Sequence, residues 1–200
     1  RDGYSLPLKR DGTVVAWGGK YAPTVPTNLF GVVAIAAGQQ HGLALKADGT
    51  VVSWGDTLAN VPIGLKNVLA IAAGGQRSMA LRTDGSVAAW GDLEAPGLFN
   101  SLTGAVAIAA ESQHIIALRT NGSMVDYFGG SHPANTAPGV ISNVLTIAAR
   151  DTHSLALKND GSVIGWNGAN LPDGLANVTA ISAGRGYSLL LTTNPPSPLL

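Results

Sequence analysis

The sequence predicts an all-β protein, a β-propeller of about five three-stranded blades, and three observations lead to this fold class. An Asp-Gly or Asn-Gly pair recurs about every 37 residues. Apolar residues around each pair alternate with a period of two, which is typical of strands. Side chains also grow from small to large across the three expected strands of each unit. The repeat domain is expected to cover residues 1–193, with a Pro-rich tail or linker at 194–200, and its units are centred on Gly12, Gly49, Gly85, Gly122 and Gly161.

Each of these Asx-Gly pairs is expected to join two strands in a hairpin. Residues 43–46 precede the pair at Asp48 with alternating apolar side chains, and a β-branched run at 51–54 follows it and ends in an aromatic residue. The same arrangement surrounds Asp84 and Asp160. Glycine accepts the positive φ that a tight hairpin turn requires, so the pairs predict the second and third strands of each blade.

An alanine-rich first strand precedes each hairpin after the first and also the last second strand, over residues 33–37, 69–73, 106–110, 145–149 and 179–183. The third strand instead carries a large aromatic residue at one equivalent position, namely Trp17, Trp54, Trp90 and Trp166, with Tyr127 in the fourth unit. Blades arranged around an axis converge near it, where small residues fit, and splay outward, where large residues fill the gap. The taper therefore favours a propeller over a flat solenoid and indicates that the tryptophans pack between blades.

The strand count leaves one strand too many for a closed ring of five blades. The second-strand pattern begins near residues 4, 41, 77, 114, 153 and 187, whereas the first and third patterns occur five times each. We expect the N-terminal strand at 14–17 to close the last blade beside residues 187–191. Pro7 cannot donate a hydrogen bond to a central ladder, so residues 1–9 would be loose or dock elsewhere. The alternative is an arc of a larger propeller, completed by self-association or belonging to a longer gene.

The repeat resembles that of the regulator of chromosome condensation superfamily of β-propellers. The residues that carry the resemblance are Ala34 to Gly38, His41 to Lys46 and Asp48 to Gly55, and the pattern recurs over residues 4–192. The short three-stranded unit is similar to the bacterial branch that includes β-lactamase inhibitory protein II. The resemblance implies a propeller that binds another protein, without identifying that protein.

Charge and composition exclude several classes of function. Lys and Arg number 12 and Asp and Glu number 12, and this zero net charge speaks against a nucleic-acid partner. The absence of cysteine excludes disulfides, thiolate catalysis and Cys-ligated zinc. No apolar run reaches the roughly 18 residues of a membrane span, so no membrane partner is expected. Low charge, absent cysteine and the family resemblance together suggest a bacterial protein that is secreted or held at the cell surface.

Catalytic and metal-binding candidates are few. His41, His114 and His153 occupy one repeat position, and either ligate metal or are structural residues that bond backbone groups at a turn. Equivalent positions on different blades are too far apart to share a metal ion with bonds of about 2 Å, which favours the structural role. No nucleophile, base and orienting group occur together, so we expect no enzyme, no cofactor and no metal.

The more informative positions are those where units break their own pattern. The first strand ends in glycine at Gly38, Gly74 and Gly184 but in Glu111 and Arg150 in two consecutive units. These two residues either form an exposed ion pair or mark a polar sector of a binding face. The full predicted binding surface consists of Gln39, Gln40, Gln76, Arg77, Glu111, Ser112, Arg150, Asp151, Arg185 and Tyr187.

The sequence thus predicts a non-catalytic protein-binding or assembly scaffold that uses the loops at the propeller rim. One alternative is an inhibitor of an enzyme such as a class A β-lactamase, and another is a carbohydrate-binding propeller. The inhibitor function is disfavoured because Tyr187 is the only aromatic residue at the turns where the β-lactamase inhibitor branch carries aromatic anchors. Self-association through residues 1–9 or the C-terminal strand is a further hypothesis.

Overall fold

The computed structural model describes residues 4–19, 22–56, 60–93, 99–111, 114–128, 139–150, 153–184 and 186–193. Its strands are β1 (Tyr4–Ser5), β2 (Trp17–Gly18), β3 (Val32–Ala37), β4 (His41–Lys46), β5 (Val51–Gly55), β6 (Val68–Gly74), β7 (Arg77–Arg82), β8 (Val87–Gly91), β9 (Ala105–Ala110), β10 (His114–Arg119), β11 (Met124–Phe128), β12 (Val144–Arg150), β13 (His153–Lys158), β14 (Val163–Trp166), β15 (Val178–Gly184) and β16 (Tyr187–Thr192). The expected tail at 194–200 lies outside the described residues.

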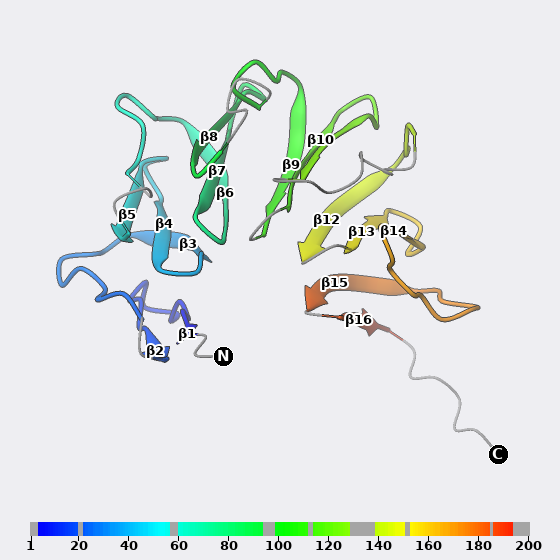
Figure 1. Ribbon diagram of the computed structural model, residues 1–200, viewed down its shortest axis with the longest axis horizontal. Helices are drawn as coiled ribbons and strands as arrows, with labels where there is room; N and C mark the ends of the chain where they lie inside the picture. Colours follow the sequence, from blue (N-terminus) through cyan, green and yellow to red (C-terminus); the bar gives the residue numbers. More distant parts are fainter. Residues whose placement is uncertain are drawn as a thin grey trace.

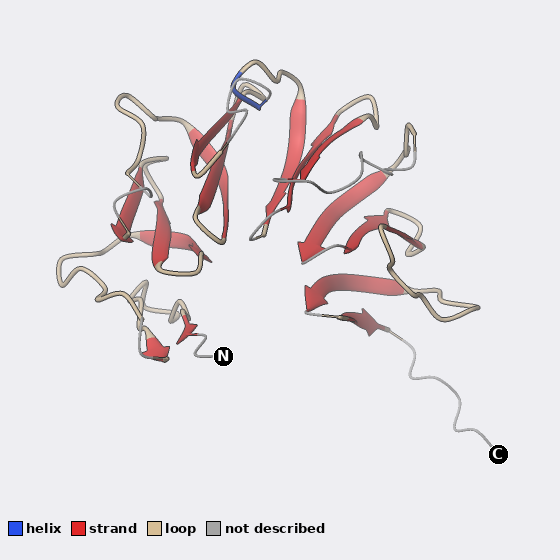
Figure 2. Cartoon of the chain, in the orientation of Figure 1, coloured by secondary structure: helices blue, strands red, loops and turns tan. Residues whose placement is uncertain are grey.

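The strands form six antiparallel sheets, which we number in chain order. Sheet 1 pairs β1 with β2, and sheet 6 pairs β15 with β16. Sheets 2 to 5 each place the second strand of the unit between the first and the third, in the orders β3-β4-β5, β6-β7-β8, β9-β10-β11 and β12-β13-β14. The prediction of an all-β propeller with three-stranded blades is confirmed, and Figure 2 shows strands throughout with one short helical turn at residues 99–100. Among the described residues, no helix is long and apolar enough to cross a membrane.

The sheets follow one another around an arc that is open between sheets 1 and 6 (Figure 1). The predicted closure is therefore wrong: β2 pairs with β1, in the register Tyr4↔Gly18 and Ser5↔Trp17, and not with β16. The hairpin joins residues near in sequence, so it costs little loop-closure entropy, whereas ring closure would join the two ends of the chain. Pro7 is tolerated because β1 has no first strand on its other side among the described residues.

The Asx-Gly hairpins form as predicted, with a larger loop than two residues. At the second unit the amide of Gly49 donates to the carbonyl of Lys46 at 2.9 Å, and Gly49 has a φ of 77°. Asp48 Oδ1 accepts hydrogen bonds from the amide of Thr50 at 2.9 Å and its hydroxyl at 2.6 Å. The hydrogen bonds from Thr50 lower the pKa of Asp48. The turn therefore closes through the left-handed Gly49, as the hairpin signal predicted.

The second strand of each sheet turns alternate side chains toward its two neighbours. In β4, Leu43 and Leu45 pack with Ala80 and Trp90 of sheet 3. In β10, the equivalent pair packs with sheet 5, in a cluster that contains Ile116, Leu118, Ala156 and Trp166. The first, third and fifth positions of each second strand therefore form a forward face, which is covered by the next sheet along the chain.

The third-strand tryptophans lie on the opposite, backward face of sheets 1, 2, 3 and 5. Trp54 packs against Leu6 and Leu8 of sheet 1, and Trp90 and Trp166 pack in the same way against the sheets before them. These three residues are 7%, 8% and 7% exposed, as expected for packing residues between blades, whereas Trp17 is 57% exposed. The interfaces between sheets 1 and 2, 2 and 3, and 4 and 5 therefore join an aliphatic forward face to a tryptophan-bearing backward face.

Candidate functional site

The predicted binding residues lie in, or at the strand ends next to, the turns between the first and second strands of each unit, which we call the inner turns. They cover residues 38–40, 75–76, 111–113, 151–152 and 185–186, so Ser112, Asp151 and Arg185 lie outside the described residues. In Figure 1 the arrowheads of β12 and β15 point toward the middle of the arc, so the C-terminal ends of these first strands lie on its concave side. Gln39 and Gln40 are exposed there, and Gln76 is half-buried.

Two neighbouring inner turns are joined by an ion pair. Arg150 Nε lies 3.5 Å from Glu111 Oε1, and the side chains are 47% and 15% exposed. An ion pair at a solvent-exposed rim contributes at most about 1 kcal/mol to stability. The pair therefore adds little to the fold and leaves a cation and an anion fixed side by side on the surface.

The glycines that end the other first strands have a packing reason. A Cβ built on Gly74 would lie 2.1 Å from Glu111 Cα in the next sheet, and one on Gly184 would lie 2.3 Å from the ring of Tyr187. A Cβ on Gly38 would lie 2.1 Å from the imidazole of His41. Glycine is retained at these three positions because a neighbour approaches, and the units with Glu111 and Arg150 present side chains instead.

Arg77 differs from the other predicted binding residues because it is buried. It is 6% exposed, and its Nε donates a hydrogen bond of 2.8 Å to the carbonyl oxygen of Asp92. The neighbouring Gln76 donates from Nε2 to Asp56 Oδ2 of the preceding sheet at 3.4 Å. Arg77 therefore holds the inner turn to its own sheet rather than presenting a charge to solvent.

A small pocket lies beside the last described inner turn. It has a volume of about 200 Å³ and is lined by His153, Gly168, Ala169, Asn170, Gly186, Tyr187 and Ser188. Pockets for drug-sized ligands and cofactors usually hold about 300 to 1,000 Å³ and are mostly apolar. This pocket is smaller than that range, and three of its seven lining residues are glycine or alanine.

The three repeat-position histidines each contact a serine side chain of the following sheet, a kind of partner that the structural interpretation did not include. His41 Nε2 lies 3.0 Å from Ser78 Oγ, and His153 Nε2 lies 3.3 Å from Ser188 Oγ. His114 Nε2 lies 3.3 Å from Ser154 Oγ in the same arrangement. All three imidazoles are buried, and within the described ranges no three potential ligands lie close enough to hold a metal ion.

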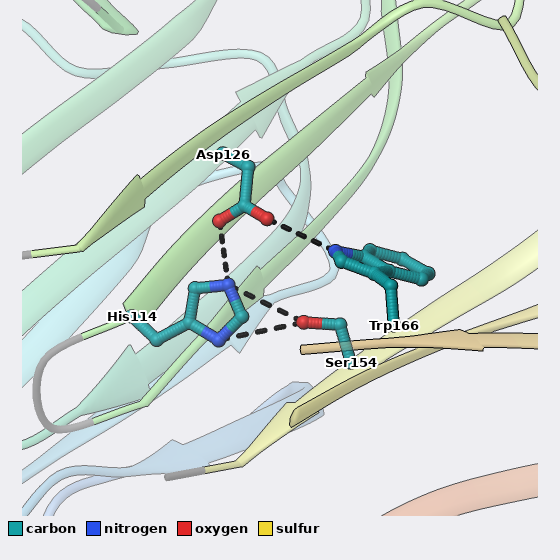
Figure 3. Close-up of polar contacts among 4 residues, drawn as sticks. All are labelled: His114, Asp126, Ser154 and Trp166. Atoms are coloured by element: carbon teal, nitrogen blue, oxygen red, sulfur yellow. Dashed lines mark hydrogen bonds and ion pairs between the residues drawn. The ribbon is translucent and has the colours of Figure 1, made fainter. Parts of the chain in front are cut away.

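The fourth and fifth sheets share a larger buried polar network (Figure 3). Asp126 on β11 accepts through Oδ1 from His114 Nε2 at 2.5 Å and through Oδ2 from the indole N–H of Trp166 at 3.1 Å. Sequence reasoning missed Asp126, although a signal was present. It occupies the third-strand position that holds Ser53, Ala89 or Gly165 in the other three-stranded sheets.

Ser154, His114 and Asp126 are the residue types of a hydrolytic triad, but their geometry does not suit that reaction. In a triad, the serine and the carboxylate bind opposite nitrogens of the imidazole. Here the carboxylate and the shortest serine contact share Nε2. The side chains of His114 and Asp126 are both 0% exposed, and Ser154 is fully buried as well, so no substrate reaches the hydroxyl. The network holds two sheets together.

Comparison with known proteins agrees with this architecture. Residues 32–57 match the family model of the Regulator of chromosome condensation (RCC1) repeat. No curated protein sequence matches the chain significantly.

Three solved structures share the fold over 96% of this chain. The ectodomain of the receptor kinase CR4 from Physcomitrella patens has a TM-score of 0.79 at 21% identity, and this chain spans 58% of its length. Prp20p from Saccharomyces cerevisiae has a TM-score of 0.73 at 19% identity, with 68% of its length covered. Human WBSCR16 has a TM-score of 0.70 at 19% identity, with 70% covered. The structure of Prp20p was determined together with its binding properties to Gsp1p and histones, and another structure shows Kap60 bound to the yeast protein.

Proposed function

Because the chain is built from RCC1-type repeats in a propeller fold, we propose that it is a non-catalytic scaffold that binds another protein through its inner turns. The observation that carries this proposal is the ion pair of Glu111 and Arg150 at two neighbouring inner turns, together with the exposed Gln39 and Gln40 at the inner turn of sheet 2. Glu111 and Arg150 replace the glycine of the other units, and their exposed ion pair contributes little to the stability of the fold. Loops held by a rigid scaffold are common sites of recognition. Binding of Gsp1p, histones and Kap60 by the yeast neighbour supports a protein partner as a class.

A charge swap separates recognition from stability. In the double variant Glu111→Arg with Arg150→Glu the ion pair is retained, so the free energy of unfolding should stay within about 0.5 kcal/mol of that of the native chain. A partner that reads the order of the two charges should lose at least tenfold in affinity, since like charges then face each other across the interface. Binding is measured by biolayer interferometry against candidates captured from the source proteome.

The control for this swap is Lys66→Glu, an exposed charge reversal on the segment that leads into β6, away from the inner turns. The control should bind every captured partner with native affinity. If the swapped variant binds as tightly as the native chain, or if the control loses the same partners, the inner turns are not the recognition surface.

The narrower functions stay predictions. An enzyme-inhibitor role would require the chain to abolish turnover of a class A β-lactamase at stoichiometric concentration. A carbohydrate-binding role would require retention on a glycan array. Secretion or surface display in a bacterium is tested by fractionating cells that express the natural gene.

A further inference from the structure

The last sheet of the arc leaves a complete forward face uncovered. Tyr187, Leu189 and Leu191 of β16 are 59%, 61% and 64% exposed. The residues at the same positions of β13 are His153, Leu155 and Leu157, which are 6%, 0% and 0% exposed under sheet 6. No other described strand pairs with the outer edge of β16. Sheet 6 therefore has the side chains of an internal sheet without the neighbour that covers them elsewhere.

The first sheet leaves the matching backward face uncovered. Trp17 is 57% exposed, whereas Trp54 at the same repeat position is 7% exposed because sheet 1 covers it. Ser5, which pairs with Trp17 and belongs to the same face, is exposed as well. The two ends of the arc thus carry the two halves of the interface that joins successive sheets inside the chain.

We propose that the chain associates head to tail with a second copy of itself, the forward face of sheet 6 packing against the backward face of sheet 1. The occupant follows from the repeat, because at three internal interfaces (between sheets 1 and 2, 2 and 3, and 4 and 5) the surface that covers the forward face is the tryptophan-bearing face of the next sheet. Within one chain the two faces lie apart at the ends of the arc (Figure 1). The zero net charge of the chain means that no long-range repulsion opposes the approach of two copies.

The interface between sheets 1 and 2 gives the expected contacts. There the hydroxyl of Tyr4 donates to the carbonyl oxygen of His41, which opens the second strand of the next sheet. Tyr187 occupies the position of Tyr4 in the last unit, so its hydroxyl should donate to the carbonyl of Tyr4 in a second copy. Leu189 and Leu191 should then cover Trp17 of that copy, as Leu6 and Leu8 cover Trp54.

Such an interface uses two different patches, so each copy keeps one free patch after the first contact. The association is therefore expected to continue beyond a dimer as concentration rises. It also predicts that blocking either patch stops growth, and that the two blocked forms complement each other.

The test is light scattering of the 200-residue chain across a hundredfold concentration range. The native chain should exceed its monomer mass of 20.3 kDa, with a mean mass that rises with concentration. Leu189→Glu should block the forward face and Trp17→Glu the backward face. Each should be monomeric alone at concentrations where the native chain associates, and an equimolar mixture should give a 1:1 dimer that grows no further.

The control is Leu69→Glu, since Leu69 is 61% exposed at a bulge of β6, away from both patches. It should associate like the native chain, and circular dichroism should show that all variants keep the native strand content. A native chain that stays monomeric throughout the range overturns the proposal. So does a mixture of the two blocked variants that stays monomeric, or a control that dissociates as fully as Leu189→Glu.

Discussion

At the scale of single residues, burial decides which polar side chains serve the fold. His114 and Asp126 have no exposed side-chain surface, and their oxygen and nitrogen atoms are satisfied by Ser154 and Trp166 of the next sheet. Removing one member of such a buried network leaves polar atoms of the other members without a hydrogen-bond partner. By contrast, Glu111 and Arg150 keep contact with solvent, so their charges are available to a partner.

Asp126→Ala should lower the free energy of unfolding by about 3 kcal/mol or more. The substitution leaves the imidazole of His114 and the indole N–H of Trp166 buried without their acceptor. Equilibrium urea unfolding followed by tryptophan fluorescence measures the change. Asp173→Asn, on an exposed turn, is the matched control and should stay within about 0.5 kcal/mol of the native chain. An Asp126→Ala protein as stable as this control would show that the network contributes nothing.

His41 should make stability depend on pH near neutrality. Burial lowers the pKa of its imidazole below 6.5 and outweighs the opposing attraction of Asp56. The unfolded chain then binds more protons, so the free energy of unfolding is at its plateau above pH 6.5 and falls as the pH drops below that value. Urea midpoints of His41→Gln should fall less between about pH 7 and pH 5 than those of the native chain. Equal slopes for the two proteins would contradict the assignment.

At the scale of elements, the hairpin turn is also the joint between neighbouring sheets. The carbonyl oxygen of the turn glycine accepts from the amide that opens the next unit, as from Ile141 to Gly122 at 2.9 Å and from Val68 to Gly49 at 3.0 Å. The residue before each first strand has a positive φ, and asparagine supplies it at Asn67, Asn143 and Asn177. Asparagine tolerates this conformation better than most residues. One turn therefore closes its own hairpin and fixes the start of the following sheet.

Two glycine substitutions should separate the cost of backbone strain from the cost of a steric clash between the turn glycine and the next sheet. Gly64 and Gly122 have φ values of 80° and 78°, but a Cβ on Gly64 meets nothing within 4 Å, whereas one on Gly122 meets Ile141 O at 2.3 Å. Gly64→Ala should cost about 1 to 2 kcal/mol through the left-handed backbone alone. Gly122→Ala should cost clearly more, because sheet 5 must shift to accommodate the methyl group. Thermal unfolding of both variants measures the difference, and equal losses would exclude the contact.

At the scale of the whole molecule, each sheet is stabilised by its neighbours in the arc. Interior sheets are covered on both faces, and the second strands β4, β7, β10 and β13 are buried over five consecutive residues. Strand β16 has the sequence of a second strand, yet its residues alternate between exposed and half-buried. In an array stabilised by nearest-neighbour contacts, such a terminal unit is the least stable.

Amide hydrogen exchange should therefore be fastest in β16 among the second strands β4, β7, β10, β13 and β16. The measurement is made by mass spectrometry at a concentration where light scattering finds only monomer. Local opening of the terminal sheet exposes its amides without unfolding of the arc. Protection of β16 equal to that of β13 under these conditions would mean that another part of the chain covers its forward face.

Much of the candidate site follows from the sequence, because it lies where the repeat is broken. The repeat locates the inner turns and singles out Glu111 and Arg150 without knowledge of contacts. It gives no information on burial, so it places Arg77 with the surface residues although the side chain is buried. It also passes over Asp126, because a single acidic residue in a strand gains meaning only from His114 and Trp166, which other strands bring to it.

The sequence by itself determined the strands of the four three-stranded sheets and their hairpin turns, because these depend on local periodicity and on glycine at positive φ. Only the tertiary structure decided how the ends of the chain are used. Strand β2 suits either β1 or β16 by its pattern, and the choice of β1 depends on the cost of closing the ring and on where the arc ends. For that reason the exposed faces of sheets 1 and 6 became visible only once the sheets were placed in space.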